Sequence, residues 1–133
     1  MKRAGYTSAA FRLARLPFAD RPGYEDWYCV AGWAALGDLN AAARDARSRP
    51  AHDSVAELAE EGWGGVYQLL RGDPGPPERA SWVSKPTGAS YGAFVAQLAA
   101  ATVWQRQLVL GPGPEFCISD AGPPDHRIRL AVS

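Results

Sequence analysis

Charged side chains stand inside the most apolar part of this sequence, between Trp82 and Cys117. Lys85, Arg106 and Glu115 lie among tryptophan, valine and leucine residues, in segments whose composition is typical of strands. Burying an unpaired charge costs a large free energy inside a protein. These groups are therefore expected either to pair with one another or to face a wet cavity.

Arg106 is the first candidate for binding. Side chains alternate between the two faces of a strand, which places Arg106 on the same side as Trp104 and Leu108. A guanidinium on such an apolar face fits a carboxylate or a phosphate in fork geometry. Glu115 and Glu25 are the internal candidates for that partner, an anionic ligand is the external one, and a place at the rim of the sheet is a further alternative.

Lys85 offers a second cationic position just before a predicted helix. The segment 86–90 follows it, and free backbone N–H groups at a helix start bind anions. The spacing differs from that of a phosphate-binding loop, which disfavours nucleoside triphosphates. An ordinary turn between a strand and a helix is the alternative interpretation of this segment.

The sequence carries no signature of metal binding or of nucleophilic catalysis. His52 and His126 have no partners at metal-ligand spacing, so we expect two surface histidines, no metal and no other cofactor. The cysteines Cys29 and Cys117 lie in apolar surroundings and are expected to be reduced thiols in the core. A thiol nucleophile made of Cys117 and His126 rests only on their nearness in the sequence.

Composition excludes several classes of partner. The chain has 14 basic and 14 acidic residues, so its charge directs it neither to nucleic acid nor to an anionic membrane. It has no apolar run near the roughly 20 residues of a membrane helix, and Arg12 and Arg15 interrupt the run that a signal peptide needs. We therefore expect a cytoplasmic protein in which residues 1–133 form a single domain.

The period of the apolar residues changes from two to 3.6 and back along the chain, which predicts strands and helices in turn. Predicted helices begin near Leu36, at Ser54 with a capping box, and at Ser90 as N-cap. The predicted strands cover residues 11–16, 27–33, 66–70, 80–85, 103–110 and, as a C-terminal edge strand, 127–132. We expect 27–33, 66–70, 80–85 and 103–110 to form one antiparallel sheet.

From Trp27 onward this order is βαββαβ, that of the ferredoxin-like fold. Through element order, aromatic-rich strands and size, the chain resembles small proteins of the dimeric α+β barrel group over roughly Trp27 to Leu110. The antibiotic-monooxygenase-like, EthD-like and NIPSNAP-like families belong to this group. The resemblance implies an α+β fold with helices on one face of an antiparallel sheet, to which this chain adds an extra N-terminal strand. It also implies a homodimer with a pocket between each sheet and its helices.

Two functions are compatible with these observations. The first is that of a ligand-binding protein, or a cofactor-free oxygenase or isomerase as the resemblance implies, that takes a planar organic molecule into an aromatic-lined pocket. Its candidate ligand-binding residues are Arg106, Lys85, Tyr67, Trp82, Trp104 and Glu115. The second is that of a non-catalytic domain that self-associates through an aromatic sheet face. A pocket reached by Arg106 or Tyr67 favours the first function, and a packed sheet with Arg106 paired to a carboxylate favours the second.

Overall fold

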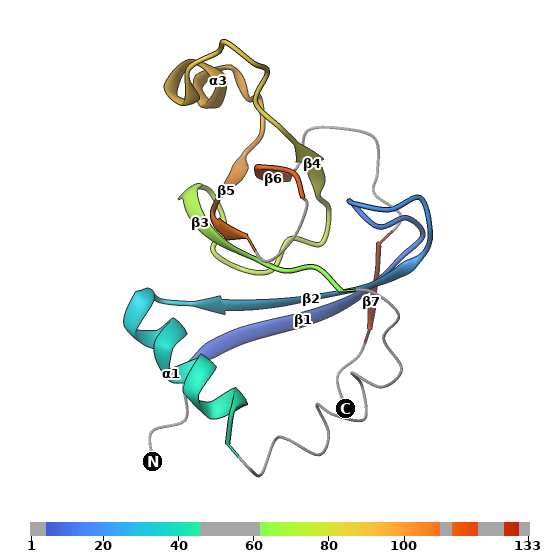
Figure 1. The fold of residues 1–133 in the computed structure, drawn as a ribbon, viewed down its shortest axis with the longest axis vertical. Coiled ribbons are helices and arrows are strands. Elements are labelled where there is room, and N and C mark those ends of the chain that lie inside the picture. The colour runs from blue at the N-terminus through green and yellow to red at the C-terminus, as the bar shows by residue number, and fades with distance from the viewer. Residues whose placement is uncertain (1–4, 46–61, 110–112, 120–126, 131–133) are drawn as a thin grey trace.

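The computed structural model describes residues 5–45, 62–109, 113–119 and 127–130, and in these ranges the strands form two antiparallel sheets (Figure 1). The first sheet has the order β2-β1-β7 and consists of β1 (Tyr6–Leu13), β2 (Gly23–Val30) and β7 (Arg127–Leu130). The second has the order β3-β5-β6-β4 and consists of β3 (Gly65–Arg71), β4 (Ser81–Val83), β5 (Thr102–Val109) and β6 (Phe116–Ser119).

The first two strands form a hairpin with one apolar face. Ala9, Phe11 and Leu13 alternate along β1 and are buried, whereas Ala10 between them is half-buried and Arg12 is exposed. Ala9 pairs with Trp27 of β2, so the tryptophan joins the same buried face. The hairpin therefore presents its apolar side to the second sheet.

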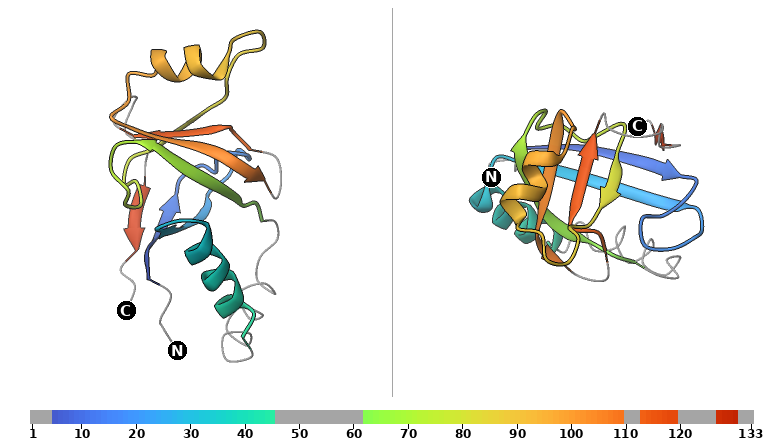
Figure 2. Two further views of the ribbon diagram at one scale, coloured as in Figure 1. Left: turned by 90° about the vertical axis from the view of Figure 1, so that its left-hand side faces the viewer. Right: turned by 90° about the horizontal axis from the view of Figure 1, so that it is seen from above.

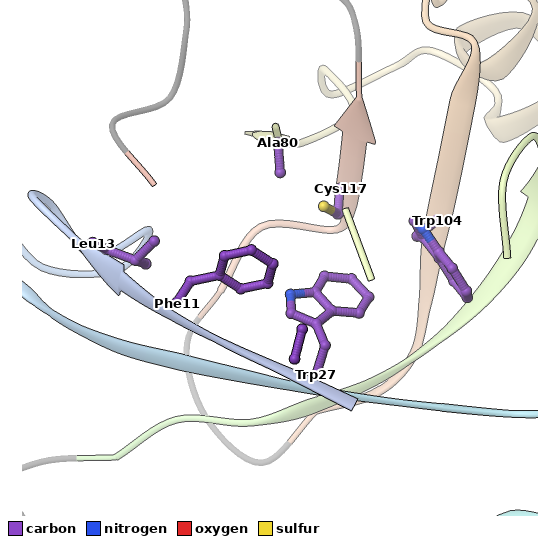
Figure 3. Packing of buried hydrophobic residues seen from close by; sticks show 7 residues of the cluster. Phe11, Leu13, Trp27, Ala80, Trp104 and Cys117 are labelled. Carbon is purple, nitrogen blue, oxygen red and sulfur yellow. The ribbon is translucent and has the colours of Figure 1, made fainter. Parts of the chain in front are cut away.

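The two sheets face each other across the main core. Figure 3 shows Phe11, Leu13 and Trp27 of the first sheet directed toward Cys117 and Trp104 of the second. Burying each large apolar side chain contributes about 1.5–3 kcal/mol to folding. This core fixes the position of Trp27 relative to the tryptophans of the second sheet.

A second core lies on the other face of the second sheet, under α3 (Tyr91–Gln97). Val103 and Phe116 are fully buried there against Phe94 and Leu98 of the helical segment. Figures 1 and 2 show α1 (Trp33–Ala43) on the opposite side of the molecule, beyond the first sheet. The described residues therefore form four layers, two sheets between two helices.

Helix α3 is held at both ends by polar contacts. The hydroxyl of Ser90 accepts a hydrogen bond from the Ala93 N–H at 3.2 Å, which confirms Ser90 as the predicted N-cap. At the other end the guanidinium of Arg71 donates to the carbonyl oxygens of Val95, Leu98 and Ala100. An arginine from β3 thus satisfies carbonyls that a short helix leaves without internal partners.

The α+β class, the additional N-terminal strand and a strand within 127–132 are confirmed, whereas the single sheet is wrong. Strand β2 pairs with β1, its neighbour in the sequence, instead of joining the second sheet. Strands that follow one another along the chain commonly pair, because the connection between them is short. Trp33 begins α1 instead of ending a strand. The two described helices lie on opposite sides of the pair of sheets, not on one face of a single sheet. The predicted helix at Ser54 lies outside the described residues.

Candidate functional site

A pocket of about 460 Å³ is lined by β2 and β3, which are edge strands of the first and the second sheet respectively. Leu36 and Leu39 of α1 contribute to it, as do Leu16 and Phe18 from the connection between β1 and β2. Its volume lies in the range of about 300–1,000 Å³ that is typical of small-molecule sites. The pocket opens at the junction of the two sheets, beside the main core.

Eight of the described residues that line the pocket are aromatic. Four are tryptophans, namely Trp27, Trp63, Trp82 and Trp104, and four are Phe18, Tyr24, Tyr28 and Tyr67. The Trp27 ring lies 5.6 Å from that of Trp104 and 6.2 Å from that of Trp82, while Tyr67 meets Trp82 edge to face at 5.5 Å. Such mutual contacts restrict ring rotation and give the pocket a defined wall.

Three indole N–H groups of this wall are buried without a hydrogen-bond acceptor among the described residues. They belong to Trp63, Trp82 and Trp104. By contrast, the indole N–H of Trp27 donates to a Glu25 carboxylate oxygen at 2.5 Å. A buried donor without an acceptor costs about 1–3 kcal/mol. All three donors belong to residues that line the pocket.

Proton-bearing groups of the wall are kept in their neutral forms. Burial raises the pKa of the Tyr67 hydroxyl, an effect that the nearby Arg106 guanidinium partly opposes. That hydroxyl donates to the Pro114 carbonyl oxygen at 3.0 Å. Burial and then the Asp73 carboxylate raise the pKa of the Cys29 thiol. Both groups thus remain hydrogen-bond donors rather than anions at neutral pH.

Arg106 supports this wall from outside the pocket. It pairs with Tyr67 across β3 and β5, and its guanidinium donates to the Gly113 carbonyl oxygen where the sequence suggested a carboxylate. A Cβ atom added at Gly113 would lie only 1.7 Å from the Trp63 ring. The bonds from Arg106 and from Tyr67 therefore hold the segment of Gly113 and Pro114 against Trp63.

The predicted face of β5 is only partly correct. Trp104 and Arg106 lie opposite Leu69 and Tyr67 in the register, on the side of the first sheet. The register shifts between Tyr67 and Val66, so that Val66 pairs with Leu108. Leu108 is 56% exposed. A bulge of this kind ends strict alternation, so Leu108 leaves the apolar face.

Lys85 and Glu115 form a separate cluster away from the pocket lining. The Glu115 carboxylate accepts from the Lys85 backbone N–H at 3.1 Å and from the Tyr91 hydroxyl at 2.6 Å. The Lys85 ammonium lies 5.1 Å from the centre of the Tyr91 ring and donates to the Pro86 carbonyl. This cluster ties β6 to the turn before α3, which supports the ordinary-turn interpretation of Lys85.

The structure thus divides the six predicted site residues into two groups. Tyr67, Trp82 and Trp104 line the pocket, whereas Lys85, Arg106 and Glu115 do not. Sequence reasoning missed Trp63, although an isolated tryptophan between glycines just before a predicted strand is a signal of a loop that packs on a sheet.

Of the two cysteines, Cys29 lines the pocket and Cys117 does not. Cys117 is buried in the main core and Cys29 is half-buried, and the two form no disulfide with each other. No group of three or more potential metal ligands occurs within the described ranges. His52 and His126 lie outside those ranges.

Comparisons with protein-family models, with curated proteins and with solved structures gave no match. Among the described helices, none has the length and apolar character needed to cross a membrane.

Proposed function

We propose that this protein binds a planar organic molecule carrying hydrogen-bond acceptors in the pocket between β2 and β3. The observation that supports this most directly is the set of indole N–H groups of Trp63, Trp82 and Trp104, buried on the wall without acceptors in the described chain. A ligand that supplies acceptor atoms relieves the cost of these buried donors. Flat aromatic surfaces of the same residues favour a flat ligand that stacks on them.

The geometry favours this function over self-association through a packed sheet face. Tyr67 lines a pocket, and Arg106 binds a main-chain carbonyl rather than the carboxylate that a closed ion pair requires. The homodimer and the cytoplasmic location that we expected from the sequence remain part of the proposal. Neither is needed for the pocket, whose described wall comes from one chain.

The activity we propose is binding rather than turnover. An oxygenase or isomerase of the cofactor-free kind needs a group that removes a proton from its substrate. In this pocket one oxygen of the Glu25 carboxylate already accepts from Trp27 at 2.5 Å. The raised pKa of Cys29 and of Tyr67 disfavours the anionic forms that could act as bases.

Calorimetric titration with 6-methoxyquinoline tests the proposal. This flat bicyclic compound is neutral in mildly alkaline buffer and carries two acceptor atoms. We expect saturable binding to the wild type and roughly fivefold to tenfold weaker binding to Trp82→Phe, which keeps an aromatic ring but removes one N–H. The matched control is Trp33→Phe, because Trp33 is 64% exposed on α1 and does not line the pocket.

Two results would contradict the proposed function. One is the absence of saturable binding by 6-methoxyquinoline. The other is an equal loss of affinity in Trp82→Phe and in Trp33→Phe, because the pocket would then have no part in binding.

A further inference from the structure

We infer that the ligand of this pocket is a flat cyclic amide, a ring that carries an N–H donor directly beside a carbonyl acceptor on its rim. This inference rests on the proposed function and adds the hydrogen-bonding class of the ligand to it. The observation behind it is that the pocket runs along the main-chain edge of β2.

Strand β2 lines the pocket without a gap in its sequence. Residues 24–30 all contribute to the wall. Side chains of consecutive strand residues point to opposite faces, and in β2 the buried Trp27 stands between the exposed Asp26 and Tyr28. A cavity that touches residues of both faces lies at the edge of the strand, where the main chain is common to all of them.

This edge has no neighbouring strand among the residues that the structure describes. Within those residues β2 ends the order β2-β1-β7 and pairs only with β1. No main-chain hydrogen bond outside the regular elements of the described ranges involves residues 26–30. In an antiparallel sheet the N–H and C=O groups of every second residue point away from the paired strand. Alternate residues of this stretch thus direct a donor and an acceptor toward the pocket.

The indoles and the strand edge together define the groups that a ligand needs. The indole N–H groups of Trp63, Trp82 and Trp104 need acceptors, whereas the outward carbonyls of β2 need a donor. A ligand with acceptors alone would cover these carbonyls without giving them a partner, which is unfavourable for a buried polar group. A cyclic amide supplies both, because its N–H and C=O lie side by side, as they do on an added strand.

The arrangement of the two sheets suits a flat ring of this kind. The sheets face each other across the main core, with Trp27 on the first and Trp104 on the second (Figure 3). A ring that pairs with β2 in the plane of the first sheet turns one face toward the second sheet, which carries Trp82 and Trp104. Its rim then meets main-chain groups while its face stacks on indole rings. The volume of about 460 Å³ is typical of a small-molecule site, which favours a ring over an added peptide strand.

Three neutral probes that share a methoxy-substituted bicyclic ring isolate the contribution of the amide. The probe 6-methoxy-2-quinolone carries the N–H beside the carbonyl, 6-methoxy-1-methyl-2-quinolone keeps the carbonyl without the N–H, and 6-methoxyquinoline has acceptors only. In calorimetric titrations in mildly alkaline buffer we expect 6-methoxy-2-quinolone to bind about tenfold tighter than 6-methoxyquinoline, because it pairs with the edge of β2. Its N-methyl derivative should lose this advantage.

Trp82→Phe is the variant that separates the strand edge from the indole donors. It removes a side-chain donor that both 6-methoxy-2-quinolone and 6-methoxyquinoline use, and it leaves the main chain of β2 in place. We expect the affinities of the two probes to fall by similar factors, so that their ratio stays near its wild-type value.

Site-resolved hydrogen exchange, measured by nuclear magnetic resonance, locates the pairing. We expect 6-methoxy-2-quinolone to slow the exchange of alternate amides within residues 26–30, because only the outward N–H groups gain a new partner. Strand β4 is the internal control, since it is also an edge strand and its Ser81 and Val83 do not line the pocket. The exchange rates of these two amides should stay unchanged.

The outcomes separate the two proposals. Equal binding of 6-methoxy-2-quinolone and its N-methyl derivative, a ratio lost in Trp82→Phe, or unchanged exchange in residues 26–30 overturns the inference, while saturable binding of 6-methoxyquinoline keeps the proposed function intact. A capped tripeptide of threonine and valine that binds more tightly than 6-methoxy-2-quinolone also overturns the inference, in favour of strand addition. Failure of 6-methoxyquinoline to bind contradicts the proposed function itself, and the inference falls with it.

Discussion

Arg106 shows why residue types alone gave an incomplete site. A guanidinium in an apolar segment needs acceptors, and the sequence offers carboxylates as the obvious ones. In the structure the acceptor is the carbonyl oxygen of Gly113, seven residues further along the chain. Arg71 likewise binds carbonyls at the end of α3. Backbone acceptors depend on the path of a loop, and residue types do not reveal that path.

Arg106→Leu is expected to destabilise the protein moderately and to weaken probe binding. The variant removes a hydrogen bond with a charged donor, worth about 1.5–3 kcal/mol, and leaves the Gly113 carbonyl without that donor. The segment of Gly113 then supports Trp63 less firmly, so affinity for the neutral probe 6-methoxyquinoline should fall as well. Urea unfolding and calorimetric titration measure the two effects.

Arg12→Leu is the control for this prediction, since Arg12 is exposed on β1 and distant from the pocket lining. Gly113→Ala tests the same contact between this segment and Trp63, because the new Cβ would collide with the Trp63 ring. An Arg106→Leu protein with wild-type stability and wild-type affinity would refute the supporting role of Arg106.

At the scale of elements, periodicity located most strands but not their partners. Alternating burial in Tyr6–Leu13 and helical spacing in Tyr91–Gln97 follow from local sequence. The division into two sheets depends on which strands pair although they are far apart in the sequence. The spacing of apolar residues within a strand does not identify its partner. Strand β6, only four residues long and preceded by a proline-rich segment, was not predicted.

The turn after β3 depends on Gly72, and its substitution should be costly. Gly72 has φ of +96°, and an added Cβ would lie 2.4 Å from the Thr102 hydroxyl oxygen and 2.5 Å from the Ala101 carbonyl oxygen. A left-handed conformation costs a residue with Cβ about 1–2 kcal/mol, and the collision adds to this. We expect Gly72→Ala to lower the free energy of unfolding by more than about 2 kcal/mol in urea titrations.

Gly37→Ala provides the opposite control. Gly37 lies inside α1, where an added Cβ meets nothing within 4 Å, so the variant should stabilise the protein by about 0.5–1 kcal/mol. If both alanine variants shifted the urea midpoint in the same direction, the backbone described for Gly72 would be wrong.

At the scale of the whole molecule, the pocket arises because two sheets meet at the junction of β2 and β3. The sequence predicted an α+β chain rich in aromatic side chains, and three of its six candidate residues, Tyr67, Trp82 and Trp104, lie in the wall of this pocket. The sequence did not predict that β2 supplies the wall of the pocket opposite β3. That wall exists only when the hairpin of β1 and β2 packs face to face with the second sheet.

The homodimer expected from the resemblance remains a prediction at this scale. The tyrosines Tyr6, Tyr24 and Tyr28 are exposed on strands β1 and β2, and the Tyr6 and Tyr28 rings lie 5.7 Å apart. Such a surface is compatible with association, but the pocket described above does not require it.

The central claim is that a ligand satisfies the indole donors of the pocket wall, and nuclear magnetic resonance observes these donors directly. The five tryptophans give separate indole N–H signals in a protein labelled with nitrogen-15. On titration with 6-methoxyquinoline in mildly alkaline buffer, we predict large saturable shifts for pocket tryptophans, led by Trp63, Trp82 and Trp104, and an unchanged signal for exposed Trp33. Unchanged signals from all three, or an equal shift of Trp33, would contradict the claim.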